Sequence, residues 1–135
     1  MAYNVFISSS QGDRGVAHDL AERLREAGAD VSEVHQSAVP EDPVKTMSSR
    51  LRKADEVFVI VSDKSLNSPY VLFEMGAAWG QHKKVTPVVV GVEDPDLPPV
   101  VKQMNYVKYS NLGGYLSDLK KKLNLPIPRP KAATR

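Results

Sequence analysis

Hydrophobic and polar positions follow two repeating patterns along this chain, one typical of strands and one typical of helices. Short segments with strand-like composition predict strands at 3–8, 29–34, 57–61, 85–90 and 105–109. Apolar residues that recur at helical spacing predict helices over 13–27, 43–54, 69–81 and 112–123. Strands and helices that alternate in this way indicate βαβ units with right-handed crossovers and a parallel sheet.

The segment Val57-Phe-Val-Ile-Val61 is apolar without alternation, as expected for a central parallel strand that is covered on both faces. We therefore predict an α/β, flavodoxin-like three-layer sandwich, in which a five-stranded parallel sheet of order 2-1-3-4-5 carries helices on both faces. The domain is expected to span residues 1–124, followed by a flexible, Pro-rich basic tail at 125–135. Pro87 lacks an amide donor, so we expect it near the start of its strand or at a bulge.

Composition narrows the possible functions. With 135 residues and 41% hydrophobic content the chain suits one domain, and the absence of cysteine excludes a disulfide framework and a thiolate nucleophile. The three histidines are scattered, so we expect no metal. No apolar run approaches the roughly 18 residues of a membrane span, and no secretory signal is visible, so we expect a cytoplasmic protein. A net charge of +2 does not by itself indicate nucleic-acid binding.

In a sheet of this order, ligands bind beyond the carboxyl ends of the strands, at the switch point between the first and third strands. The segments expected there are 8–13 and 62–68. The first is a turn with three hydroxyl side chains, Ser8, Ser9 and Ser10, next to a helix start, where amide donors and the helix dipole favour phosphate. Ordinary helix capping is the alternative, because no Gly-rich fingerprint is present.

The helix predicted over 69–81 carries the candidate catalytic group. Ser68 can cap this helix, and Pro69 suits its first position. Helical phase places Tyr70 and Glu74 on one face, and on the other face the residues that resemble core, Leu72, Met75, Gly76 and Trp79. Beside an aromatic ring, partial desolvation could prepare the Glu74 carboxylate for catalysis, whereas an exposed surface glutamate is the simpler alternative. Segments 8–13 and 36–42 and this helix should meet at one cleft.

Three segments in this order carry a family resemblance: Tyr3-Asn-Val-Phe-Ile-Ser8, Arg52-Lys-Ala-Asp-Glu-Val-Phe-Val-Ile-Val-Ser62, and Ser65-Leu-Asn-Ser68 with Tyr70 and Glu74. Together they resemble the TIR (Toll/interleukin-1 receptor) domain, and more closely its bacterial and plant-type members. The chain departs from the family where Tyr70 replaces a frequent Trp, where no cysteine follows, and where 36–43 lacks the Arg-Gly element of the BB loop.

The resemblance implies an enzyme that cleaves NAD at the bond between nicotinamide and ribose, with NAD as substrate and no cofactor. Nicotinamide leaves as a neutral base. The transition state therefore needs negative charge near an oxocarbenium-like ribose and hydrogen bonds to the ribose hydroxyls. Glu74 is the expected catalytic residue. Water would give ADP-ribose, and attack from within the same molecule would give a cyclic ADP-ribose isomer.

The remaining site residues have two interpretations each. Tyr70 would line the pocket for the ribose or stack on nicotinamide, or it would be a buried residue that only fills space. Arg14 would approach a phosphate, or would be solvated in the first helical turn. The expected substrate-binding residues are Ser8, Ser9, Ser10, Arg14, Ser68 and Tyr70.

Family members of this kind self-associate, and the 36–42 loop of one subunit then completes a neighbour's site. We therefore expect TIR–TIR contacts, with a sensor domain or effector protein as a further partner, in bacterial defence or signalling. Two alternatives remain open. One is a non-catalytic TIR interaction module, and the other is an enzyme like a nucleoside deoxyribosyltransferase, which would use the helix-borne Glu as a nucleophile and exchange bases between nucleosides.

Overall fold

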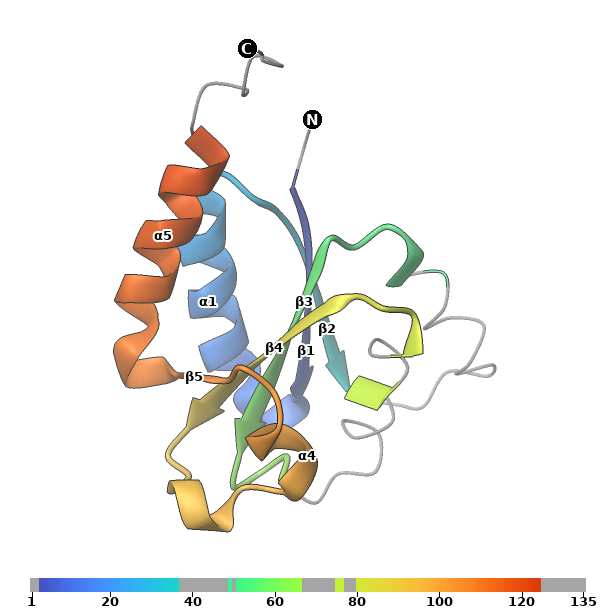
Figure 1. Cartoon of the computed structure of the whole chain (residues 1–135), viewed down its shortest axis with the longest axis vertical. Helices are drawn as coiled ribbons and strands as arrows, with labels where there is room; N and C mark the ends of the chain where they lie inside the picture. The colour runs from blue at the N-terminus through green and yellow to red at the C-terminus, as the bar shows by residue number, and fades with distance from the viewer. Residues whose placement is uncertain (1–2, 37–48, 50, 67–74, 77–79, 125–135) are drawn as a thin grey trace.

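The structure is a computed structural model of the 135-residue chain, and it describes residues 3–36, 49, 51–66, 75–76 and 80–124. Its centre is a five-stranded sheet in the order β2-β1-β3-β4-β5, and every pairing is parallel (Figure 1). The strands are β1 (Asn4–Ser10), β2 (Asp30–Gln36), β3 (Glu56–Ser62), β4 (Lys84–Val90) and β5 (Val107–Lys108). The predicted fold class and strand order are therefore confirmed.

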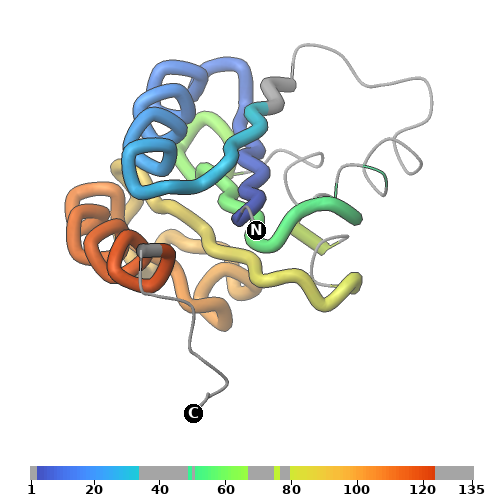
Figure 2. The backbone as a smooth tube through the Cα atoms, turned by 90° about the horizontal axis from the view of Figure 1, so that it is seen from above, coloured from blue at the N-terminus to red at the C-terminus, as the bar shows by residue number. Residues whose placement is uncertain are grey.

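Two long helices cover one face of this sheet. Helices α1 (Arg14–Glu26) and α5 (Leu112–Asn124) lie side by side on that face, as both the front view and the view from above show (Figures 1 and 2). The short helix α4 (Pro99–Lys102) follows β4, and single 3-10 turns occur at Gln11–Asp13, Asp94–Asp96 and Tyr109–Asn111. Among the helices that the structure describes, none combines the length and apolar character needed to cross a membrane.

Strand β3 contributes to both hydrophobic cores. All seven of its residues are buried, as predicted for the segment 57–61. On one face Phe58 and Ile60 pack with α1 and α5, and on the other Val57 and Val59 pack with Met75. Because alternate residues of a strand point to opposite faces, one apolar strand can anchor both cores.

The predicted helices 13–27 and 112–123 are confirmed as α1 and α5. Gly28 ends the first with φ 109, a conformation that favours glycine. Most of 43–54 and 69–81 lies outside the described residues, as do the tail 125–135 and Trp79. Leu51 and Met75 are described and buried, as their helical phase predicts.

Three local predictions were wrong. The serines at 8–10 form the end of β1, because pairing with β2 continues to Ser10 opposite Gln36. The fifth strand has two residues instead of five, since the chain enters a 3-10 turn at Tyr109. Pro87 is the fourth of seven strand residues. The structure accommodates it because β5 pairs only with Val88 and Val89, so β4 has one neighbour at Pro87.

A buried carboxylate joins four elements at the amino-terminal end of the strands. Glu56 is fully buried and accepts hydrogen bonds from the hydroxyls of Tyr3 (2.6 Å), Thr86 (2.5 Å) and Tyr115. The Lys84 ammonium lies 3.9 Å from its Oε1. These contacts connect the start of β1, β3, β4 and α5. Sequence patterns missed the network because the hydroxyl partners of Glu56 are 30 to 59 residues away along the chain.

Replacing Glu56 should destabilise the fold. Glu56→Leu leaves three hydroxyl donors without their acceptor, and we expect the free energy of unfolding to fall by about 3 kcal/mol. Urea denaturation measures this change. The matched control is Glu26→Gln, at an exposed glutamate on α1, which should change stability by less than about 0.5 kcal/mol. Equal effects of the two substitutions would show that the network contributes nothing.

Stability should also fall at alkaline pH. Burial, followed by hydrogen bonding to Glu56, raises the pKa of Tyr3 and of Tyr115 well above the ordinary value of 10.0. The unfolded chain therefore loses these phenolic protons first, and the free energy of unfolding should decrease as the pH rises above about 10. Urea denaturation at a series of pH values between about 8 and 11 tests this expectation. A Tyr3→Phe, Tyr115→Phe variant should show a shallower decrease, and an equally steep one would contradict the assignment.

Candidate functional site

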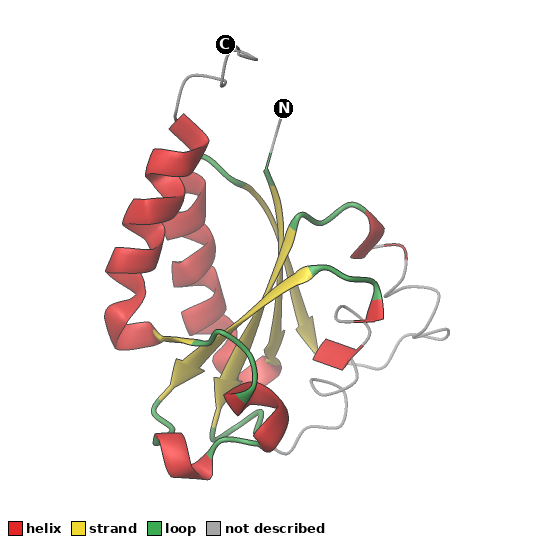
Figure 3. Ribbon diagram, in the orientation of Figure 1, coloured by secondary structure: helices red, strands yellow, loops and turns green. Residues whose placement is uncertain are grey.

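The chain leaves the carboxyl ends of β1 and β3 toward opposite faces of the sheet. After β1 it enters α1, which packs in the same core as α5. After β3 it reaches Met75, which packs in the core on the other face. Figure 3 shows the carboxyl ends of the neighbouring strands β1 and β3 at the same end of the sheet. Connections that diverge in this way create the switch point at which open parallel sheets bind ligands.

At this switch point, one carboxylate connects the two strand ends. Asp13, in the 3-10 turn after β1, is only 4% exposed. Its Oδ2 accepts a hydrogen bond from the Ser10 hydroxyl at 2.8 Å and another from the Ser62 hydroxyl at 2.6 Å. Ser62 Oγ in turn accepts the Lys64 amide at 3.1 Å. We call Ser10, Asp13 and Ser62 the switch-point cluster.

A tight turn follows β3 and fixes the direction of the chain beyond it. The buried hydroxyl of Ser65 accepts the amide of Ser62 at 2.9 Å and donates to the carbonyl of Ile60 at 3.0 Å. The Leu66 amide donates to the carbonyl of Ser62 at 2.8 Å. These three hydrogen bonds hold the turn 62–66 in one conformation.

Two cationic side chains belong to the segments around the cluster. Lys64 Nζ donates to the carbonyl of Gly12 at 3.3 Å. A Cβ added at Gly12 would lie 2.8 Å from the Lys64 side chain, so glycine at this position allows the close approach of the two segments. Arg14 begins α1 and is exposed. The arrangement thus combines oriented hydroxyls with cations, which suits a ligand that carries both hydroxyl and anionic groups.

The structure places only part of the predicted site. Ser8 and Ser9 have 0% exposure, whereas Ser10 is partly exposed. Ser68, Tyr70 and Glu74 lie outside the described residues.

Sequence patterns place segments 8–13 and 62–68 at this site but do not single out Asp13, Ser62 and Lys64 as its residues. A signal for Asp13 was present, since it follows Ser10 by three residues within the loop, a spacing typical of side-chain capping. Ser62 is the first polar residue after an apolar strand. Lys64 gave no signal. No group of three or more His, Asp or Glu side chains suited to a metal occurs within the described part of the chain.

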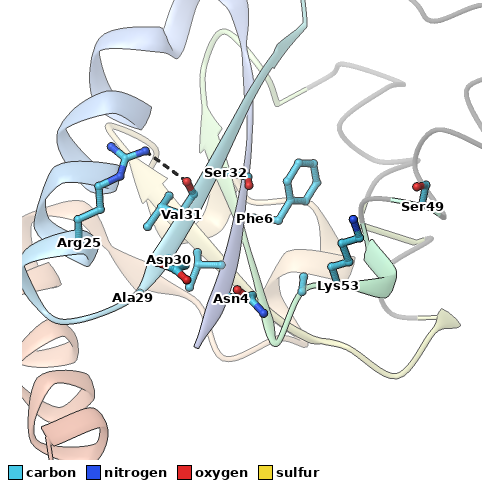
Figure 4. Close-up of a pocket in the computed structure, with 11 residues that line it drawn as sticks. Asn4, Phe6, Arg25, Ala29, Asp30, Val31, Ser32, Ser49 and Lys53 are labelled. Carbon is cyan, nitrogen blue, oxygen red and sulfur yellow. Dashed lines mark hydrogen bonds between the residues drawn. The ribbon is translucent and has the colours of Figure 1, made fainter. Parts of the chain in front are cut away.

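A separate cavity of about 790 Å³ lies along the first halves of β1 and β2 (Figure 4). Its charged lining residues, Arg25, Asp30 and Lys53, are all exposed. The Arg25 guanidinium is already engaged, because it donates to the carbonyl of Val31 at 3.2 Å. None of its described polar lining residues is buried, so this cavity is a weaker candidate than the switch point.

Solved structures with a similar fold include two TIR proteins. The TIR domain of the Toll-related receptor TRR-2 from Hydra magnipapillata has a TM-score of 0.68 and 14% identity, over 88% of this chain and 99% of that one. A metazoan TIR-STING receptor from C. gigas has a TM-score of 0.64 and 20% identity, over 91% of this chain and 40% of the receptor.

The general fold is also shared more widely. The sugar isomerase domain of an RpiR transcription factor from Sphaerobacter thermophilus has a TM-score of 0.60 at 12% identity, over 98% of this chain and 75% of that one. At these identities the structural matches show the fold alone. No curated protein matches the sequence. The sequence model of the TIR domain, however, matches residues 5–123. The chain therefore belongs to the TIR domain family.

Proposed function

We propose that this TIR domain cleaves NAD at the bond between nicotinamide and ribose, releasing nicotinamide and ADP-ribose or a cyclic ADP-ribose isomer. The observation that supports this most directly is the switch-point cluster. It joins the end of β1 to the end of β3. One of its members, Ser62, ends the strand that precedes Glu74 in the sequence. The cluster orients one partly exposed hydroxyl, that of Ser10, at the carboxyl ends of the strands, and a hydroxyl there together with the Glu74 carboxylate suits a reaction at a ribosyl carbon.

Glu74 is the proposed catalytic residue. As the positively charged nicotinamide ring departs, the positive charge moves to the ribose, and a nearby carboxylate stabilises that charge. The leaving group becomes neutral without a proton, so one carboxylate is sufficient and no metal or cofactor is needed.

The other proposed contacts divide by chemistry. Of the three serines, Ser10 is the one that a ligand reaches most easily, because it is partly exposed. Ser8 and Ser9 are buried, and their place is within strand β1, which pairs with β2. Arg14 and Lys64 are the proposed partners of the diphosphate. Ser68 and Tyr70 are proposed to border the ribose and nicotinamide.

We further propose that the domain acts in the cytoplasm, in defence or signalling, and that self-association regulates its activity. The Toll-related receptor and the TIR-STING receptor with the same fold make a signalling role the natural context. If segment 36–42 of one copy completes the site of another, specific activity will rise with protein concentration.

The receptor matches also favour a second candidate, a TIR interaction module without catalysis. Such a module would bind its partner whether or not Glu74 is present and would release no nicotinamide. An enzyme resembling a nucleoside deoxyribosyltransferase would exchange bases between nucleosides and ignore NAD. One assay with NAD and with nucleoside pairs separates the three functions.

Glu74→Gln should abolish NAD cleavage while preserving the fold. The substitution keeps the size of the side chain but removes the negative charge that stabilises the ribosyl cation, so we expect kcat to fall by about 100-fold or more. Chromatography of NAD, nicotinamide and ADP-ribose products, at several protein concentrations, measures the effect.

The control is Glu26→Gln, which makes the same chemical change at an exposed position of α1 and should leave turnover unaltered. Undiminished cleavage by Glu74→Gln would remove Glu74 from the mechanism. If the unmodified domain releases no nicotinamide at any concentration, the interaction module becomes the better account.

A further inference from the structure

The hydroxyl proton of Ser10 is already in use. Ser10 Oγ donates to Asp13 Oδ2 at 2.8 Å, and a carboxylate oxygen can only accept. A hydroxyl has one proton and two lone pairs, so Ser10 retains only lone pairs for any other partner. The residue is partly exposed, which leaves it accessible to a ligand at the switch point.

The neighbouring contacts keep this polarity fixed. The same Asp13 oxygen takes the Ser62 proton at 2.6 Å, and Ser62 Oγ accepts the Lys64 amide. Asp13 is buried at 4% exposure, so water has little access to replace either serine. Reversing the Ser10 hydroxyl would therefore cost the carboxylate one of its two short, charge-assisted bonds.

We propose that Ser10 is a specificity-determining residue that accepts a hydrogen bond from a ribose hydroxyl, and that Asp13 is the positioning residue that makes it an acceptor. This inference deepens the proposed function, on which it rests for the identity of the ligand. Under this proposal Ser10 contacts the ribose hydroxyls of a ribonucleotide, and the phosphates bind to other residues.

A phosphate does not suit Ser10. The diphosphate of a dinucleotide is fully ionised, so its oxygens, like the Asp13 carboxylate, offer no proton and would meet the lone pairs of Ser10 close to a second negative group. A ribose hydroxyl brings the missing proton. The exposed cations Arg14 and Lys64 are the groups that match phosphate.

The consequence is discrimination between ribose and deoxyribose. A site that bonds a substrate hydroxyl disfavours the analogue that lacks it, because the site's own polar group is then left unpaired. Ser10 would thus favour ribonucleotides over their dideoxy counterparts, independently of any catalysis by Glu74.

The test uses three probes: AMP, 2′,3′-dideoxy-AMP and inorganic phosphate. None of them contains nicotinamide, so the protein cannot cleave them by the proposed reaction. Their dissociation constants are measured by NMR titration of the ¹⁵N-labelled full chain, following the amides of Ser10, Gly12 and Lys64. The unmodified protein should bind AMP about 3- to 10-fold more tightly than dideoxy-AMP. In Ser10→Ala, AMP binding should weaken by the same factor, while dideoxy-AMP and phosphate binding should not change.

Two further variants make the result specific. Asp13→Ala removes the bond that orients the Ser10 hydroxyl and frees its proton, so the AMP to dideoxy-AMP ratio should fall while phosphate, which can now accept that proton, should bind no more weakly, whereas a purely structural role would weaken all three probes equally. Should Asp13→Ala fail to fold, Ser10→Ala still decides. Ser110→Ala, at an exposed serine in the 3-10 turn Tyr109–Asn111, is the control and should bind as the unmodified protein does.

The inference is overturned if the unmodified protein does not distinguish the two nucleotides, if neither binds, or if Ser10→Ala weakens phosphate binding as much as AMP binding. The proposed function fails separately. Discrimination without nicotinamide release would retain the ribose site and reject the NAD-cleaving reaction, and nicotinamide release without discrimination would do the reverse.

Discussion

The complete burial of β3 on both of its faces is the constraint on which the rest of this structure depends. A strand with no exposed face must be covered by two layers, and its alternating side chains anchor one core with α1 and α5 and another with Met75 and α4. The connections that follow β1 and β3 must then pass to opposite faces. The divergence of these two connections creates the switch point, so the position of the candidate site is a consequence of the packing.

Buried polar groups at the two ends of the strands serve different purposes. At the amino-terminal end, Glu56 is fully enclosed by hydroxyl donors, and the network connects four elements. At the carboxyl-terminal end, Asp13 is buried but bonds to Ser10, which reaches the surface. The first arrangement contributes to the fold alone. In the second, a buried carboxylate fixes the orientation of a hydroxyl that is partly exposed.

Sequence patterns predicted the features that depend on local order. The apolar run 57–61 indicated the central strand, and the helical spacing of leucines indicated α5 with nearly its observed bounds. What they missed depends on distant partners. The serines at 8–10 extend β1 because Gln36 lies opposite, and Asp13 meets Ser62 across 49 residues of sequence. Glu74 stays a prediction, based on helical phase and on family resemblance, because it lies outside the described residues.

A crystal structure of the domain with a non-cleavable carbocyclic analogue of NAD tests the location of the site most directly. We expect the analogue beyond the carboxyl ends of β1 and β3, with a ribose hydroxyl on Ser10, the diphosphate near Arg14 and Lys64, and Glu74 beside the nicotinamide-bearing ribose. Binding in the 790 Å³ cavity between Arg25 and Lys53 would contradict this location. A ligand that leaves the switch-point cluster untouched would contradict it equally.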